Sequence, residues 1–288
     1  MLFVTGCTVA TNNPNGRSDN SPAIQLETLQ FAVTDVDSME ELQRDYEPFR
    51  VALENALDTK VEFFLVKNLV AAAPALKSGR VDLVWAGPSE YVVIRARTQA
   101  VPVVAVTRPD FRSIIVVRSD SGIDSLADLK DKTIDMYKVG STSSHIGAVK
   151  LLMDAGLDPQ SDVNIVMSEK YTLQGLKNGE VDARFIAPHR YEKVLKDEGL
   201  SRSDYPIIAG GSLLPSDVLV VSSQLNSEVV EEIRSRLLAN QDELIEAILA
   251  SEAMAKKFKG ASLAPASDVD YDMIREVYRA IGQGEFLE

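Results

Sequence analysis

A run of hydroxyl side chains at the start of a helix is the part of this sequence best suited to chemistry. Residues 140–145 are Gly-Ser-Thr-Ser-Ser-His; they follow the apolar stretch Thr133–Met136 and precede a helical pattern of apolar residues. The first backbone N–H groups of a helix have no partner within it, and the helix dipole places positive charge there. With the hydroxyls added, such a tip can bind an anion. Taken alone, the stretch also fits an ordinary Ser/Thr helix cap.

Short apolar runs alternate with helical patterns along most of the chain, which predicts an α/β fold with helices on both faces of its sheets. The last part differs, because it contains two helical patterns over Ser227–Ala250 and Tyr271–Ile281. Strands are predicted at Leu29–Val33, Val61–Leu65, Val81–Trp85, Val101–Val106, Ile114–Val117, Thr133–Met136, Val163–Met167, Ala183–Ala187, Ile207–Ala209 and Val218–Val221. Helices are predicted between them at Tyr46–Ala56, Val70–Lys77, Ser89–Arg97, Leu173–Asn178 and Tyr191–Glu198.

An internal repeat indicates two similar lobes. Leu76–Asp82 (LKSGRVD) recurs 100 positions later as Leu176–Asp182 (LKNGEVD). The similarity extends to Pro88 and Tyr91, which correspond to Pro188 and Tyr191. Each copy has the pattern helix, Gly stop, strand, proline turn and helix start. Because open α/β sheets bind ligands at the carboxyl ends of their strands, the two proline turns are expected to face each other across a cleft.

The amino-acid composition limits the kinds of partner that the protein can bind. The 288 residues suffice for two domains, and 45% hydrophobic with 25% charged residues is typical of a soluble globular protein. The formal net charge of −13 argues against nucleic acid or an anionic membrane, so local donors must hold any bound anion. One cysteine and two histidines exclude a disulfide and a zinc cluster, and no cofactor is expected.

The first residues resemble the end of a bacterial lipoprotein signal. Val4-Thr5-Gly6-Cys7 fits the apolar-small-small-Cys pattern, although only Met1–Phe3 remain of an apolar core, so the start is interpreted as truncated or misassigned. The polar segment Thr8–Ser21 would be a flexible tether. We therefore expect lipid attachment at Cys7; a disordered cytosolic N-terminus is the alternative.

Several motifs together resemble the phosphonate/phosphite/phosphate-binding family of periplasmic proteins that serve ABC importers. The resemblance covers about Glu27–Gln283. Its two most specific pieces are Ser141-Thr142-Ser143, similar to the family's oxyanion site, and Leu214–Asp217, whose Asp217 matches an acidic residue that closes the pocket. The other pieces are Trp85–Tyr91, Phe111–Val117 and Ser125–Lys130.

The resemblance implies a type II periplasmic binding protein with two Rossmann-like lobes joined by a hinge and the ligand in the interlobe cleft. Residues 1–25 would be signal and tether, residues 26–112 with 217–288 lobe 1, and residues 113–216 lobe 2. It further implies a monomeric, periplasmic, non-enzymatic protein whose partners are a small phosphorus oxyanion and an ABC permease. The protein would touch the membrane only through a lipid on Cys7.

Four positions depart from the family's aminophosphonate binders. Those relatives have Tyr about where Leu69 and Phe111 stand, His where Glu169 falls, and an ammonium-binding Glu where His189 stands. Because His189 removes the reason to bind an amine, we expect phosphite, phosphate or methylphosphonate. Tyr171 is a candidate to line the pocket in place of Glu169.

The expected roles follow from residue chemistry. Ser141, Thr142 and Ser143 would donate hydroxyl and backbone N–H bonds to the phosphoryl oxygens. Asp217, which only accepts hydrogen bonds when ionised, would require a P–OH proton and so reject sulfate. Tyr91 and His189 would add donors, with His189 changing charge near neutral pH; packing of the Tyr91 ring under its turn and a lone exposed histidine are the alternatives.

Three other functions stay open. The same fold could bind a sulfonate, a pyrimidine precursor or an amino-acid analogue. A hydrolase using Ser144 and His145 is disfavoured, because no Gly-x-Ser-x-Gly turn and no phosphate-binding Gly-x4-Gly-Lys loop is present. A cytoplasmic regulator would need a DNA-binding module, and the leading segment is too short and too polar for one.

Overall fold

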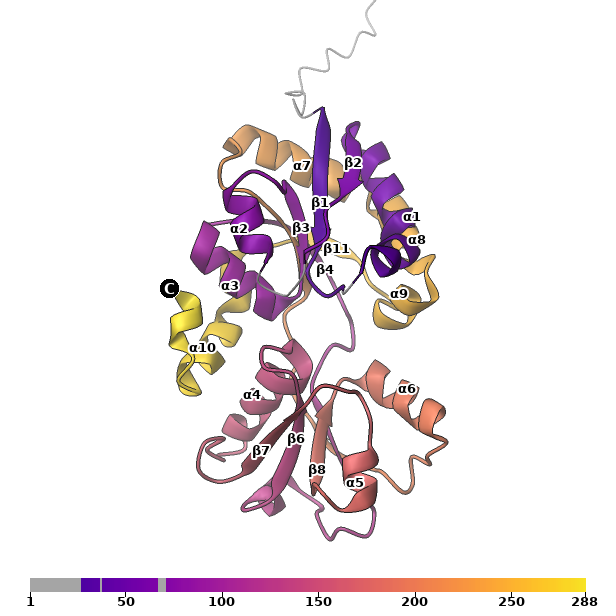
Figure 1. Ribbon diagram of the computed structural model, residues 1–288, viewed down its shortest axis with the longest axis vertical. Coiled ribbons are helices and arrows are strands. Elements are labelled where there is room, and N and C mark those ends of the chain that lie inside the picture. The colour runs from indigo at the N-terminus through magenta and orange to yellow at the C-terminus, as the bar shows by residue number, and fades with distance from the viewer. Residues whose placement is uncertain (1–26, 37, 67–70) are drawn as a thin grey trace, which may run out of the picture.

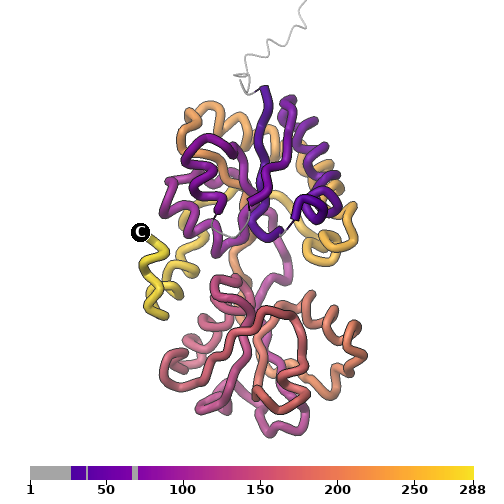
Figure 2. The backbone as a smooth tube through the Cα atoms, viewed as in Figure 1, coloured from indigo at the N-terminus to yellow at the C-terminus, as the bar shows by residue number. Residues whose placement is uncertain are grey.

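The computed structural model describes residues 27–36, 38–66 and 71–288. Cys7, the segment Thr8–Ser21 and Leu69 lie outside the described residues. In the described part, two mixed sheets form two bodies, one above the other in Figure 1. Two chain segments, residues 107–113 and 211–216, connect the sheets, and the tube in Figure 2 follows both between the bodies.

The first sheet has the strand order β11-β4-β10-β3-β1-β2, with β1, β2 and β3 parallel and β10 antiparallel to β3. The second has the order β7-β6-β8-β5-β9, with β6, β7 and β8 parallel and β5 antiparallel to β8. The strands are β1 Thr28–Val33, β2 Lys60–Phe63, β3 Leu83–Ala86, β4 Val101–Val106, β5 Ile114–Val117, β6 Thr133–Tyr137, β7 Asn164–Ser168, β8 Ala183–Ile186, β9 Ile207–Gly210, β10 Asp217–Val221 and β11 Leu263–Pro265.

The two sheets repeat one arrangement, β2-β1-β3-β10 in the first and β7-β6-β8-β5 in the second. The repeated motif places β3 and β8 in equivalent positions, each followed by a helix that begins at a proline. The prediction of a mixed α/β protein with two sheets is therefore confirmed. The predicted boundaries at 112/113 and 216/217 fall between β4 and β5 and between β9 and β10.

Helices cover both sheets (Figure 1). They are α1 Met39–Leu57, α2 Ala72–Lys77, α3 Pro88–Thr98, η1 Leu126–Leu129, η2 Thr142–Ile146, α4 Gly147–Asp154, α5 Gln174–Asn178, α6 Pro188–Glu198, α7 Ser227–Ala239, α8 Gln241–Leu249, α9 Glu252–Lys257, η3 Asp268–Tyr271, α10 Asp272–Ala280 and η4 Gly284–Leu287. None of the helices in these ranges is long and apolar enough to cross a membrane.

The C-terminal segment packs against both bodies. Helix α10 contacts α3 beside the first sheet and η2 beside the second, and Figure 1 shows it at the side of the junction. Ile274, Val277 and Tyr278 of α10 belong to one buried apolar cluster that includes residues of both sheets. Gln160 also donates a hydrogen bond of 2.8 Å to the carbonyl of Ala280. Helix α10 therefore braces the junction between the two bodies.

Candidate functional site

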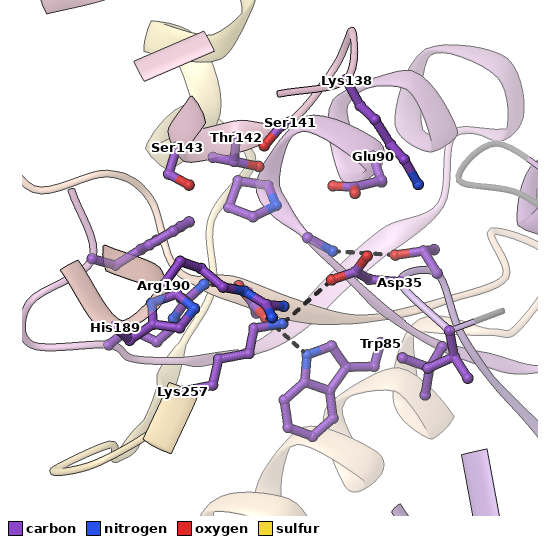
Figure 3. A pocket seen from close by; sticks show the side chains of 18 of the residues that line it. Asp35, Trp85, Glu90, Lys138, Ser141, Thr142, Ser143, His189, Arg190 and Lys257 are labelled. Atoms are coloured by element: carbon purple, nitrogen blue, oxygen red, sulfur yellow. Dashed lines mark hydrogen bonds and ion pairs between the residues drawn. The ribbon is translucent and has the colours of Figure 1, made fainter. Parts of the chain in front are cut away.

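A cleft of about 440 Å³ lies between the two bodies, at the carboxyl ends of β1, β3, β6 and β8. Its lining combines hydroxyls, four cations and four carboxylates, so its formal charge is balanced within a protein that carries −13. Figure 3 shows the hydroxyls on one side and His189, Arg190 and Lys257 on the other. The polar and charged lining residues include Asp35, Glu41, Glu90, Arg108, Lys138, Ser141, Thr142, Ser143, Tyr171, His189, Arg190, Asp217 and Lys257.

The hydroxyl run lies where predicted, at a helix start that opens into this cleft. Helix η2 begins after Ser141 with a wide π turn, in which the Ile146 N–H donates to the Ser141 carbonyl at 3.0 Å, and α4 continues it. Ser141 forms no side-chain capping bond. Single π turns are frequent at functional sites, and here the N–H groups that begin η2 and the hydroxyls of Ser141 and Ser143 lie beside the cleft. The Ser141 N–H, which was expected to bind the ligand, instead donates to the Lys138 carbonyl at 3.1 Å.

The Thr142 hydroxyl was predicted to bind the ligand, but in the structure it forms hydrogen bonds with Ser89. It pairs with the Ser89 hydroxyl at 2.8 Å and accepts from the Ser89 N–H at 3.3 Å, which joins η2 to α3 across the cleft. The Ser89 hydroxyl donates in turn to the Glu90 carboxylate at 2.9 Å, so the Thr142 proton points to Ser89. Burial, with a contribution from Asp35, raises the Glu90 pKa to about 7. In this arrangement Thr142 offers the cleft its backbone N–H and not its hydroxyl.

Asp217 lines the cleft as predicted, but its carboxylate already has three donors. Arg108 lies at 3.3 Å from one oxygen, while Lys257 at 3.4 Å and the Trp85 indole N–H at 3.3 Å meet the other. Burial alone would raise the pKa of Asp217; the charges of Lys257 and Arg108 outweigh it and lower that pKa. The idea that an anion meets an uncompensated carboxylate here is therefore wrong, because the group of Asp217, Arg108 and Lys257 carries a net charge of +1.

Arg108 is held between aromatic rings. Its guanidinium carbon lies 3.6 Å from the centroid of Phe111 and 5.4 Å from that of Phe258. The side chain is 6% exposed, and its Nε atom has no hydrogen-bond partner among the residues that the structure covers. The Phe111 ring thus supports a buried cation.

Arg190 and Tyr171 form the neighbouring wall. The Arg190 guanidinium lies 4.7 Å above the Tyr171 ring, which stacks on Tyr137 with centroids 3.9 Å apart. Tyr171 lines the cleft, in agreement with the prediction that it lines the pocket. His189 also lines the cleft, but burial and the charges of Arg108, Arg190 and Lys257 lower its pKa to about 2. His189 is therefore neutral at physiological pH, and the expected change of charge near pH 7 is corrected.

Tyr91 does not belong to the cleft lining. Its ring is fully buried against Tyr271, and its hydroxyl donates to Asp268 at 2.6 Å. Tyr191, its counterpart in the repeat, is buried in the same way and donates to the Tyr205 carbonyl. Since helical spacing turns the fourth residue of each helix into its own lobe, the role predicted for Tyr91 is wrong.

The Ser144–His145 pair has no geometry for nucleophilic catalysis. The Ser144 hydroxyl is buried without a hydrogen-bond partner in the described part of the chain. His145 Nδ1 accepts from the Gly140 N–H at 3.1 Å, and burial lowers the His145 pKa to about 4. His145 therefore fixes the loop before the helix.

Apart from Asp217, the charged side chains of the site are not indicated by any sequence motif. Arg108, Lys257 and Asp35 come from three separate segments that share no motif, and only the fold brings them together. Glu90 and Arg190 had a usable signal, because both lie within the first three residues of helices that the repeat places at the cleft. Both residues line the cleft.

Comparisons with known proteins agree with this architecture. Residues 31–271 match the family described as ABC transporter, phosphonate, periplasmic substrate-binding protein. The phosphate-import protein PhnD of Mycolicibacterium smegmatis is 24% identical, covering 98% of this chain and 93% of the relative. The structure of PhnD1 from Prochlorococcus marinus with methylphosphonate has a TM-score of 0.67 at 20% identity, over 89% of this chain and 99% of that one. The Escherichia coli aliphatic sulphonate-binding protein SsuA has a TM-score of 0.62 at 15% identity, over 91% and 94%. At these identities the two solved structures show the fold alone.

Proposed function

Because the chain belongs to the family of periplasmic substrate-binding proteins of phosphonate ABC transporters, we propose that its interlobe cleft captures a phosphorus oxyanion for delivery to a permease. Phosphite, phosphate and methylphosphonate are the smallest candidates. The η2 tip carries this proposal, since the backbone N–H groups that begin this helix and the hydroxyls of Ser141 and Ser143 lie at a cleft that also holds cations.

Capture would involve rotation of lobe 1 (residues 26–112 and 217–288) relative to lobe 2 (residues 113–216). The Ser89–Thr142 hydrogen bonds join the two lobes on one side of the cleft, and the Asp217 group lies at the start of a connecting strand. A bound anion would add contacts to both lobes and favour the closed arrangement.

Selectivity between phosphorus acids and sulfate would depend on the remaining acceptor position of Asp217. A carboxylate offers about four acceptor sites, and three donors already occupy Asp217. A P–OH group can donate to the last one, whereas sulfate has no proton to donate. The net positive charge of the Asp217 group means that this selection would be a preference and not a strict exclusion.

Titration calorimetry tests the proposal. The parent protein is expected to bind methylphosphonate, phosphite or phosphate more tightly than sulfate. Ser143→Ala removes one hydrogen bond to a charged acceptor, so affinity should fall about 10- to 100-fold. Ser144→Ala is the matched control, because the Ser144 hydroxyl is buried and has no hydrogen-bond partner among the described residues; this variant should change affinity less than about twofold. Equal affinities in both variants would remove the η2 tip from its role.

Lipid attachment at Cys7 and a monomeric state remain parts of this proposal. The polar residues after Cys7 would then tether the binding domain to a membrane. Mass spectrometry of detergent-extracted protein tests the first, since an unmodified Cys7 in the membrane fraction would contradict it. Light scattering, which measures the molar mass in solution, tests the monomeric state.

A further inference from the structure

Three side chains that line the cleft have donor groups without an acceptor. The Arg190 side chain lies over the Tyr171 ring but forms no ion pair or hydrogen bond with any other residue that the structure describes, and the His189 imidazole has no such partner among those residues either. The Nε atom of Arg108 is likewise unpaired in the described part. Such donors in a partly buried site are costly unless a ligand supplies acceptors.

The His189 and Arg190 side chains start next to the η2 tip, after the adjacent strand of the same sheet. His189 and Arg190 begin α6 directly after β8, while Ser141–Ser143 follow β6, and β6 and β8 are adjacent parallel strands. Figure 3 shows His189 and Arg190 at a separate position from the hydroxyls along the cleft. One ligand with acceptors at both ends can therefore reach both groups.

Two stacked tyrosine rings fix the orientation of the Arg190 side chain. It stacks on Tyr171, which stacks on Tyr137, so its planar fork is held without using any of its five N–H donors. The nearby carboxylates are engaged elsewhere: Asp217 with Arg108 and Lys257, and Asp35 with Lys257 at 3.9 Å. An incoming planar anion would meet a pre-oriented fork.

We propose that the preferred ligand class is a phosphonate whose substituent ends in a carboxylate. This proposal rests on the proposed function: the phosphoryl group occupies the η2 tip, and the carboxylate binds Arg190 with His189 beside it. A cleft of about 440 Å³ exceeds what one small oxyanion fills and falls in the range of sites for larger organic ligands. A second phosphoryl group fits less well than a carboxylate, because Asp35, Glu41 and Glu90 share the cleft and repel additional charge.

Calorimetry with four ligands tests the proposal on the parent protein: methylphosphonate, phosphonoacetate, aminoethylphosphonate and methylenebisphosphonate. Phosphonoacetate is expected to bind about 10- to 100-fold more tightly than methylphosphonate, which corresponds to one added charge-assisted hydrogen-bond pair. Aminoethylphosphonate should bind more weakly than methylphosphonate, because its ammonium group faces Arg190. Tighter binding of the bisphosphonate than of phosphonoacetate would overturn the choice of carboxylate.

The variant Arg190→Gln identifies the responsible group. The ratio of phosphonoacetate to methylphosphonate affinity should fall to about one, whereas Lys196→Gln, an exposed charge on the same helix, should preserve the ratio. Arg190→Lys keeps the charge without the fork and should retain only part of the preference. An unchanged ratio in Arg190→Gln would place Arg190 on the phosphoryl group and overturn the inference.

Failure of the inference and failure of the proposed function give different results. Parent protein that binds methylphosphonate at least as tightly as phosphonoacetate contradicts only the carboxylate proposal. Parent protein that binds none of the phosphonates contradicts both. The ligand comparison on the parent needs no variant, so it decides even if Arg190→Gln fails to fold.

Discussion

Replacing Asp217 with asparagine should destabilise the protein and at the same time strengthen its binding of sulfate. Asp217 and Arg108 have side chains only 3% and 6% exposed, so the substitution leaves a buried guanidinium without its counter-ion. Lys257, 18% exposed, loses the same partner but can reach water more easily. The amide keeps one oxygen as an acceptor but provides no compensating charge.

The size of both effects follows from this geometry. Removing one partner of a buried ion pair costs about 3–5 kcal/mol. The retained amide oxygen places this case near the lower end, about 3 kcal/mol, which corresponds to a melting temperature roughly 6–12 °C lower. The charge of the Asp217 group would rise from +1 to +2, and one added unit across a partly hydrated cleft strengthens anion binding on the order of tenfold.

Thermal unfolding and sulfate titration at pH 7 measure these effects. Asp120→Asn is the control, because Asp120 also pairs with an arginine but is 80% exposed and should contribute little. Since the pKa of Asp217 is lowered in the folded state, its stabilisation is present above about pH 4 and is lost as the pH falls through the lowered pKa. A melting temperature within 2 °C of the parent together with unchanged sulfate affinity would refute the ion-pair argument.

Two further substitutions test the corrected assignments. Tyr91→Phe should leave methylphosphonate affinity unchanged in calorimetry while it lowers the free energy of unfolding by about 1–2 kcal/mol, because only the bond to Asp268 is lost; a large loss of affinity would return Tyr91 to the site. Glu90, with its pKa raised to about 7, makes folding less favourable as the pH rises from about 4.5 through 7. Glu90→Gln should remove this trend, up to about 2 kcal/mol between pH 5 and 8 in urea unfolding, and an unchanged pH profile would contradict the buried position of Glu90.

The periodicity of apolar residues identified the ten predicted strands, because strands of a covered sheet are nearly continuous apolar runs. It missed β11, Leu263–Pro265, which is three residues long and has no pattern of its own. The helical stretch Ser227–Ala250 is two helices, since Asn240 turns its side chain back to the Arg236 carbonyl and leaves the helical conformation. Helix α1 begins earlier than predicted, because the Ser38 hydroxyl caps it by accepting from the Glu41 N–H.

The sequence by itself determined the class of fold, the repeat and the hydroxyl-bearing helix tip, because all three depend on local spacing along one stretch of chain. Only the tertiary structure decided which charges accompany that tip. Arg108, Lys257 and Asp217 lie far apart in sequence, and their pairing in a buried site depends on β4, β10 and α9 meeting at one end of the first sheet. The same packing pairs Tyr91 with Asp268 and Thr142 with Ser89 by hydrogen bonds. Each bond joins two distant segments of the chain, and neither segment has a sequence pattern that indicates its partner.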